Sequence, residues 1–153
     1  MLLFGWFCST TDFFSSLILA EVFAGLGIRA YVGKLSMDQN SLPNYIEPSG
    51  AAALSSAKSF IDSVKSLAAS LPEGQQNLVH PVLTPRFVPT CSDELLEGLG
   101  RLAVNEDVRV QSHMCEALDQ VEWVRSSRER EDEDIFQQVR FKRILCTTRA
   151  RAC

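Results

Sequence analysis

Strand-like and helix-like patterns alternate along most of this chain, and this alternation limits its fold more than any other feature. Short apolar stretches at residues 29–35, 78–83 and 108–113 have the composition of buried strands. Apolar residues recur at helical spacing in residues 13–27, 54–71, 92–103 and 118–124, and Ser92 can cap the third of these helices. Strands that alternate with helices over short connections pair in parallel. We therefore predict an α/β fold with a parallel sheet and helical crossovers.

Composition narrows the class of protein further. The chain has 153 residues and 46% hydrophobic residues, enough for one domain with a substantial core. The net charge of -4 gives no general attraction to nucleic acid or to an anionic membrane. The apolar N-terminal segment is interrupted by Asp12 and Glu21, so we interpret it as a buried strand and helix rather than as a signal peptide. The five cysteines lack C-x-x-C spacing, which favours a cytoplasmic location over a disulfide framework or a zinc ribbon.

His113 ends the third strand pattern, VRVQSH (108–113), and Glu116 follows three residues later. Catalytic residues of parallel α/β folds gather at the carboxyl ends of strands, where His113 lies; His80 lies near an amino end. A neutral imidazole can bind zinc, and a nearby carboxylate can transfer protons. The alternative is a surface histidine beside a helix whose N-terminus favours the charge of Glu116. The residues alone leave both interpretations open.

The preceding strand ends in T-P-R-F (84–87), a second candidate site. Arg86 offers a planar set of donors and Phe87 a flat apolar face, a combination that suits a planar, polar heteroaromatic ligand. The alternative is that Arg86 pairs with a nearby acid. A third strand end carries Lys34, Met37 and Asp38, which could also belong to the site. The alternative for this segment is a solvated loop with one buried methionine. Because the carboxyl ends of parallel strands share one edge of the sheet, we expect these groups to face the same crevice.

Three blocks of sequence resemble the guanine deaminases of the amidohydrolase superfamily: AYVGKLSMD (30–38), VLTPRFVPTCSDELLEGLG (82–100) and VRVQSHMCEALDQVEWV (108–124). The resemblance runs from about residue 9 to about residue 138. It implies a partial (β/α)8 barrel of the TIM type, with roughly strands 2 to 5 and their helices. It also implies a zinc-dependent hydrolase, with guanine as the substrate and xanthine and ammonia as the products.

The resemblance assigns a role to four residues. His113 matches a zinc ligand, and Glu116 matches the catalytic carboxylate that moves protons between the zinc-bound water and the purine. Arg86 and Phe87 match residues that bind the guanine ring. The family's remaining ligands to its single zinc ion, an H-x-H pair, a further histidine and an aspartate, have no counterpart here. Because a catalytic zinc normally has three protein ligands, we expect the chain to be inactive by itself.

The last residues depart from this pattern. Residues 129–134, EREDED, have the composition of a solvated acidic run, and residues 139–153 contain five cations and no acid. We therefore predict a partial barrel domain at residues 1–138 and a disordered basic tail at 139–153. The tail either binds something acidic or derives from outside the original reading frame.

Two alternatives to the deaminase remain open. One is a non-enzymatic, truncated α/β protein that associates with a full-length deaminase subunit, since the family forms homodimers. The other is an unrelated α/β binding module in which His113 is structural. A barrel cut open exposes two strand edges and an apolar face, so we expect poor solubility or association of the isolated chain. We expect neither nucleic acid nor a membrane as a partner.

Overall fold

The computed structural model describes residues 2–3, 13–139 and 144–146. In chain order, the elements are β1 (Leu2–Leu3), α1 (Phe13–Gly25), β2 (Ala30–Val32), β3 (Leu35–Ser36), α2 (Gly50–Ser70), β4 (Val79–Pro85), the 3-10 helix η1 (Val88–Thr90), α3 (Asp93–Glu106), β5 (Arg109–Ser112), α4 (Leu118–Arg128), α5 (Asp132–Gln138) and β6 (Ile144–Cys146). The alternation of strands and helices predicted from the sequence is therefore confirmed.

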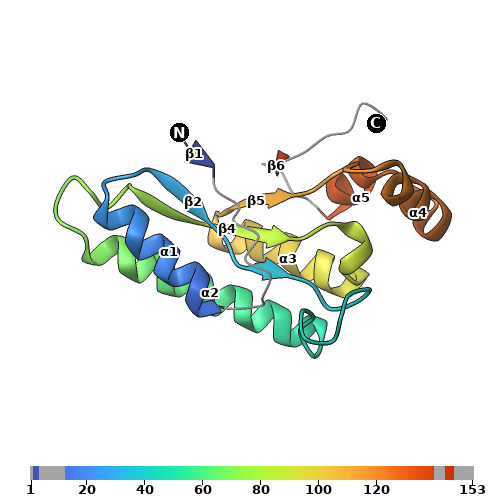
Figure 1. Ribbon diagram of the computed structural model, residues 1–153, viewed down its shortest axis with the longest axis horizontal. Coiled ribbons are helices and arrows are strands. Elements are labelled where there is room, and N and C mark those ends of the chain that lie inside the picture. The colour runs from blue at the N-terminus through green and yellow to red at the C-terminus, as the bar shows by residue number, and fades with distance from the viewer. Residues whose placement is uncertain (1, 4–12, 140–143, 147–153) are drawn as a thin grey trace.

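All strand pairs of the sheet are parallel, in the order β1-β2-β4-β5-β6, and β3 also pairs with β4. Figure 1 shows α1, α2 and α3 along one face of the sheet, with α4 and α5 beyond the carboxyl end of β5. This is the layered α/β arrangement that helical crossovers produce between parallel strands. It confirms the predicted fold class and brings the ends of β4 and β5 side by side.

The two longest helices begin at serine caps. The Ser49 side chain accepts a hydrogen bond from the Ala52 amide at 3.1 Å, and Ser92 accepts one from the Leu95 amide at 3.1 Å. Such caps satisfy amides that have no partner within the helix, and each stabilises it by about 1 kcal/mol. The Ser92 cap was predicted from the sequence, whereas α2 begins four residues before its predicted start at residue 54 because Ser49 caps it.

The core has two parts, one on each side of α2. One part joins α2, α3, β4 and β5, with Leu95, Leu99 and Phe136 fully buried. The other joins α1, β2 and α2 around Phe60, whose ring meets that of Phe13 edge to face at 5.6 Å. Burial of each large apolar side chain contributes about 1.5–3 kcal/mol. Together these clusters hold the three helices against the sheet.

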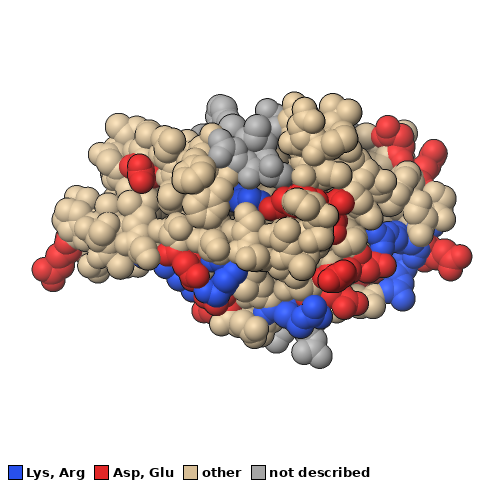
Figure 2. Space-filling view, turned by 90° about the horizontal axis from the view of Figure 1, so that it is seen from below, with Lys and Arg blue, Asp and Glu red and all other residues tan. Residues whose placement is uncertain are grey.

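One face of α1 carries an apolar stripe that remains exposed. Phe14, Ile18, Val22 and Leu26 recur every four residues and are 70%, 57%, 49% and 68% exposed. Figure 2 views the helix side of the molecule, where acidic and basic side chains lie near one another among residues of other types. Contiguous exposed apolar surface promotes association. Among the residues that the structure describes, no helix combines the length and the apolar character that a membrane span requires.

Part of the predicted tail belongs to the sheet. Strand β6 pairs with β5, with Val110 opposite Ile144 and Ser112 opposite Cys146. Val139 caps the end of α5 and packs against the core, and its carbonyl oxygen approaches Gly100 so closely that a Cβ atom there would collide with it. This differs from the prediction that residues 139–153 lie outside the fold. Parallel pairing depends on backbone groups, which leave no periodic signal in three residues. The rest of the predicted tail lies outside the described residues.

Candidate active site

Arg86 connects the carboxyl ends of three strands through its backbone. Its amide donates to the Ser36 carbonyl at the end of β3 (3.2 Å), and its carbonyl accepts from the His113 amide just after β5 (3.1 Å). Its guanidinium carbon lies 5.3 Å from the centre of the Phe87 ring, and Nη1 lies 3.9 Å from the Met37 sulfur. Among the described residues these guanidinium contacts involve no carboxylate, so Arg86 keeps donors for a ligand.

His113 is buried, with 8% of its surface exposed. Burial is the main cause that lowers the pKa of its imidazole below the ordinary 6.5; the charge of Arg86 adds to this, and that of Glu116 opposes it. The neutral form, which has a lone pair for a metal, is therefore favoured. Within residues 2–3, 13–139 and 144–146, no group of three or more His, Cys, Asp or Glu side chains could hold a metal ion. The described residues therefore do not fit a complete catalytic zinc site.

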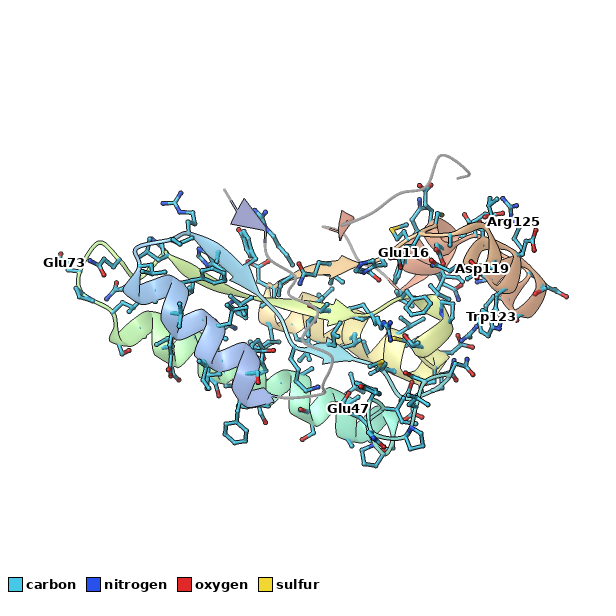
Figure 3. The ribbon with its side chains drawn as sticks, viewed as in Figure 1. Glu47, Glu73, Glu116, Asp119, Trp123 and Arg125 are labelled. Carbon is cyan, nitrogen blue, oxygen red and sulfur yellow. The ribbon has the colours of Figure 1, made fainter. Side chains whose placement is uncertain are left out.

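Glu116 lies in the turn between β5 and α4, and its side chain is exposed. It lines a cavity of about 380 Å³. Figure 3 labels Glu116, Asp119 and Trp123 near α4 and α5, at the end of the molecule toward which β4 and β5 run. The cavity is bounded by residues from three loops, the 3-10 helix η1 and α4: Asn40, Phe87, Pro89, Glu116, Ala117, Asp119, Gln120 and Trp123. Apolar rings and a few polar groups are the usual lining of a small-molecule site.

The four predicted site residues are thus brought together. Phe87 and Glu116 share the cavity, Arg86 lies against Phe87, and the backbones of Arg86 and His113 are hydrogen-bonded. Arg86 and His113 do not line the cavity. The expectation that all four residues face one crevice therefore stays a prediction for Arg86 and His113.

The third strand end supports the site without facing it. Lys34, 3% exposed, forms an ion pair with Glu47 at 2.5 Å, and Met37 is 1% exposed. Asp38 accepts hydrogen bonds from the amide (2.8 Å) and the hydroxyl (2.5 Å) of Ser92, the N-cap of α3. The solvated-loop interpretation of this segment is therefore wrong. Its polar groups find partners in the fold that sequence order does not reveal.

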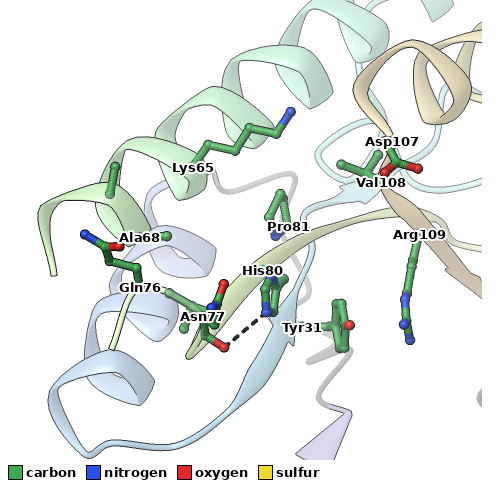
Figure 4. Close-up of a pocket in the computed structure, with 12 residues that line it drawn as sticks. Tyr31, Lys65, Ala68, Gln76, Asn77, His80, Pro81, Asp107, Val108 and Arg109 are labelled. Atoms are coloured by element: carbon green, nitrogen blue, oxygen red, sulfur yellow. Dashed lines mark hydrogen bonds between the residues drawn. The ribbon is translucent and has the colours of Figure 1, made fainter. Parts of the chain in front are cut away.

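The opposite end of the strands is built differently. The His80 ring stacks on Tyr31 with centroids 5.2 Å apart, and its Nε2 lies 3.1 Å from the Asn77 carbonyl oxygen. The Arg109 guanidinium lies 4.8 Å from the Tyr31 ring on β2. Figure 4 shows these side chains beside Lys65 around a cavity of about 520 Å³ at the amino ends of the strands. His80 is thus a packing residue, remote from His113.

The two cysteines with described side chains offer no nucleophile. Cys91 is buried and donates to the Ser36 carbonyl at 3.3 Å, and burial raises the pKa of its thiol to about 12. Cys115 is buried and takes part in a disulfide bond. The cysteine spacing predicted no disulfide framework, so this bond was not predicted from the sequence. Pairing depends on three-dimensional proximity, which spacing alone does not report.

Sequence reasoning missed Asp132 and Gln120, which lie directly behind the Glu116 turn. Asp132 belongs to the run interpreted as a solvated acidic segment, yet it is 2% exposed. The interpretation is wrong at this residue because α5 turns one face toward the core, where Ile135 and Phe136 are buried. Apolar residues three and four positions after Asp132 were the available signal for a helix with a buried face.

Comparison with known proteins shows the family of the chain. The profile of the Amidohydrolase family matches residues 9–151. The guanine deaminase of Dictyostelium discoideum is 39% identical over 112 residues, which make up 73% of this chain and 23% of that protein. The chain spans about a quarter of the length of the curated relatives it matches.

Solved structures have the same arrangement of strands and helices. The crystal structure of guanine deaminase from C. acetobutylicum, with guanine bound in its active site, aligns with a TM-score of 0.74 and 32% identity. The alignment covers 86% of this chain and 30% of that one. An adenosine deaminase from Xanthomonas campestris with bound zinc aligns with a TM-score of 0.66 over 86% of this chain and 28% of that one. Its identity of 16% supports the fold alone.

Proposed function

Because the chain belongs to the amidohydrolase family, we propose that it carries the guanine-binding and proton-transfer part of a guanine deaminase site. The observation that carries this proposal is the shared cavity of Phe87 and Glu116, with Arg86 in contact with the Phe87 ring and hydrogen-bonded through its backbone to His113. A flat ring, a planar cation and an exposed carboxylate suit a purine with polar edges. The relatives named above, one with guanine in its active site, support this choice of substrate.

Recognition of guanine is assigned to Arg86 and Phe87. Guanine presents two neighbouring acceptors, O6 and N7, whereas adenine has an amino group in place of O6. A guanidinium pairs with two such acceptors at once, so Arg86 favours guanine over adenine. Phe87 offers its ring for stacking, which contributes about 1–3 kcal/mol per base in other proteins.

Proton transfer is assigned to Glu116. Hydrolytic deamination adds water to the ring carbon and releases ammonia, so one proton must leave the water and another must reach the departing amine. A carboxylate at the cavity wall can accept the first proton and donate it in the second step. Glu116 is the described acid that combines this position with proximity to His113.

For the metal, one ligand is assigned. We propose His113 as one zinc ligand, since burial keeps its imidazole neutral. A catalytic zinc uses three protein ligands, and the described residues supply one candidate, so we assign no step to the metal. The chain by itself is then expected to bind guanine without turning it over. A cytoplasmic location and association with itself or with a full-length deaminase subunit stay predictions.

Guanine binding to the isolated chain tests the proposal. Trp123 lines the cavity, so its fluorescence should change saturably as guanine is added, and less with adenine. Arg86→Ala should weaken guanine binding about tenfold or more, since a charge-assisted hydrogen bond contributes about 1.5–3 kcal/mol. Arg101→Ala, at an arginine exposed on α3, is the matched control and should leave binding unchanged. Absence of saturable binding, or equal affinity for both variants, would exclude the assigned site.

A further inference from the structure

The turn that carries Glu116 is tied to a buried carboxylate on α5. We propose that Asp132 is a positioning residue, which orients Glu116 through the backbone of Cys115 and the side chain of Gln120. This inference rests on the proposed function, in which Glu116 transfers the proton. It adds a residue from the acidic run at 129–134 to the machinery of the site.

Three hydrogen bonds form the connection. Asp132 Oδ2 accepts from the Cys115 amide at 2.8 Å and from Gln120 Nε2 at 3.0 Å. The other end of the same Gln120 amide group, Oε1, accepts from the Glu116 amide at 3.0 Å. Two consecutive backbone amides of the turn are thereby held, one directly and one through Gln120. Asp132 and Gln120 are 2% and 8% exposed, so little water competes for these bonds.

The turn needs such support because its backbone is unusual. Cys115 has a φ of 47°, in the left-handed region that non-glycine residues rarely adopt. A residue persists in this conformation when its surroundings fix it. The hydrogen bonds of Asp132 and Gln120 to the amides of residues 115 and 116 supply this constraint together with the disulfide bond of Cys115. They also set the direction in which the Glu116 side chain leaves the backbone.

The local helix does not explain the position of Asp132. The N-cap of α5 is Glu131, whose side chain makes no capping hydrogen bond. Asp132 instead bonds to groups 17 and 12 residues earlier in the chain. Its second oxygen, Oδ1, is buried and has no hydrogen-bond partner among the described residues. The carboxylate is therefore directed at the Glu116 turn rather than at its own helix.

Gln120 carries the connection into the site. Its side chain bonds to Asp132, and the residue also lines the cavity with Glu116 and Phe87. A displacement of Asp132 therefore changes the position of Glu116. Arg86 and Phe87 follow β4 and keep their positions. This predicts an effect on proton transfer that is separate from guanine binding.

Amide hydrogen exchange in the full chain, followed by NMR, tests the connection without any need for turnover. Asp132→Ala should speed exchange at Cys115 and Glu116 about tenfold or more, while the amides of α3 keep their rates. Asp132→Asn retains an acceptor oxygen and should largely restore protection. Asp134→Ala, at an exposed acid on the same helix, is the matched control and should change neither amide. Unchanged exchange at both amides in folded Asp132→Ala would overturn the proposal.

A second variant keeps the test decisive if Asp132→Ala does not fold. Gln120→Ala removes the acceptor of the Glu116 amide but leaves the bond from the Cys115 amide to Asp132. Exchange should then increase at Glu116 and remain slow at Cys115. Equal rates at both amides, or no change at Glu116, would contradict the proposed path.

Kinetics then separate this inference from the proposed function. The assay uses the Dictyostelium guanine deaminase with its matching segment replaced by this chain. In that protein, Asp132→Ala should lower kcat about tenfold or more with KM for guanine unchanged, and Asp132→Asn should recover most of the loss. An unchanged kcat, where Glu116→Gln abolishes turnover, would overturn the positioning role. If Glu116→Gln itself had no effect on turnover, the proposed function would fail. The amide hydrogen exchange of Cys115 and Glu116 would still test whether Asp132 holds the turn.

Discussion

The two ends of β4 and β5 carry similar residue types but use them in different ways. At the carboxyl ends, backbone hydrogen bonds join Arg86 to Ser36 and His113, and side chains hold the Glu116 turn. At the amino ends, the His80 ring stacks on the Tyr31 ring, and the Arg109 guanidinium also lies against the Tyr31 ring. A histidine at one end is thus a ligand candidate, and a histidine at the other is packing. Position along a parallel strand, more than residue type, indicates its role.

The largest expected effect on stability comes from breaking the buried ion pair between Lys34 and Glu47. Lys34→Ala leaves Glu47 buried without its partner and should lower the free energy of unfolding by about 3–5 kcal/mol. Urea denaturation measures this change. Lys34→Met combined with Glu47→Leu should recover most of the stability, because no charge is then buried.

An exposed lysine provides the control for that prediction. Lys58 forms an ion pair with Asp62 on the surface of α2, where solvent screens the charges. Lys58→Ala should produce no measurable change. Equal losses for Lys34→Ala and Lys58→Ala would show that burial does not strengthen the inner pair.

The second prediction separates ligand binding from packing. Phe87→Ala should weaken guanine binding by about 1–3 kcal/mol, or about 5- to 150-fold, because a stacking face is lost. A fluorescence titration with the isolated chain measures the affinity. Tyr31→Ala removes an aromatic ring at the amino ends and should leave the affinity unchanged. If both substitutions weakened binding equally, the cavity at the carboxyl ends would not be the guanine site.

The third prediction concerns the amino ends alone. His80→Ala removes the ring that stacks on Tyr31 and should lower the free energy of unfolding by about 1 kcal/mol. Thermal unfolding detects this change, and His80→Phe should preserve much of the stacking. Loss of guanine binding in His80→Ala would give His80 a role in the site that its position argues against.

The smallest expected effect is a pH dependence at Asp132. Burial is the main cause that raises the pKa of this carboxyl above the ordinary 3.8, opposed by the hydrogen bond from the Cys115 amide. The folded protein then holds the proton more tightly than the unfolded chain, so this contribution to stability is lost as pH rises above about 4.

Comparison with Asp132→Asn isolates that contribution. The stability of the native protein relative to the variant should fall over the pH window above about 4, because asparagine does not ionise. Denaturation curves at several pH values in this window measure the difference. A relative stability that rose with pH would mean that the folded state favours the ionised carboxylate.

Local signals account for what the sequence predicted well. The apolar periodicity of α2 and α3 and the Ser92 cap lie within single elements. Arg86, Phe87, His113 and Glu116 could be placed at strand ends because the carboxyl ends of parallel strands converge. The role of Asp132 could not be predicted, because it depends on a turn 17 residues earlier in the chain. Strand β6 could not be predicted either, because it depends on backbone pairing with β5. The ion pair of Lys34 with Glu47 depends likewise on the tertiary fold.

The central claim is that the carboxyl ends of β4 and β5 carry deaminase chemistry centred on Glu116. The most direct measurement is xanthine formation by the Dictyostelium guanine deaminase in which this chain replaces the matching segment. We predict turnover of guanine by that protein, and a loss in kcat of about 10²–10⁴-fold in Glu116→Gln with guanine binding retained. A folded, guanine-binding Glu116→Gln protein that forms xanthine at the unsubstituted rate would contradict the claim.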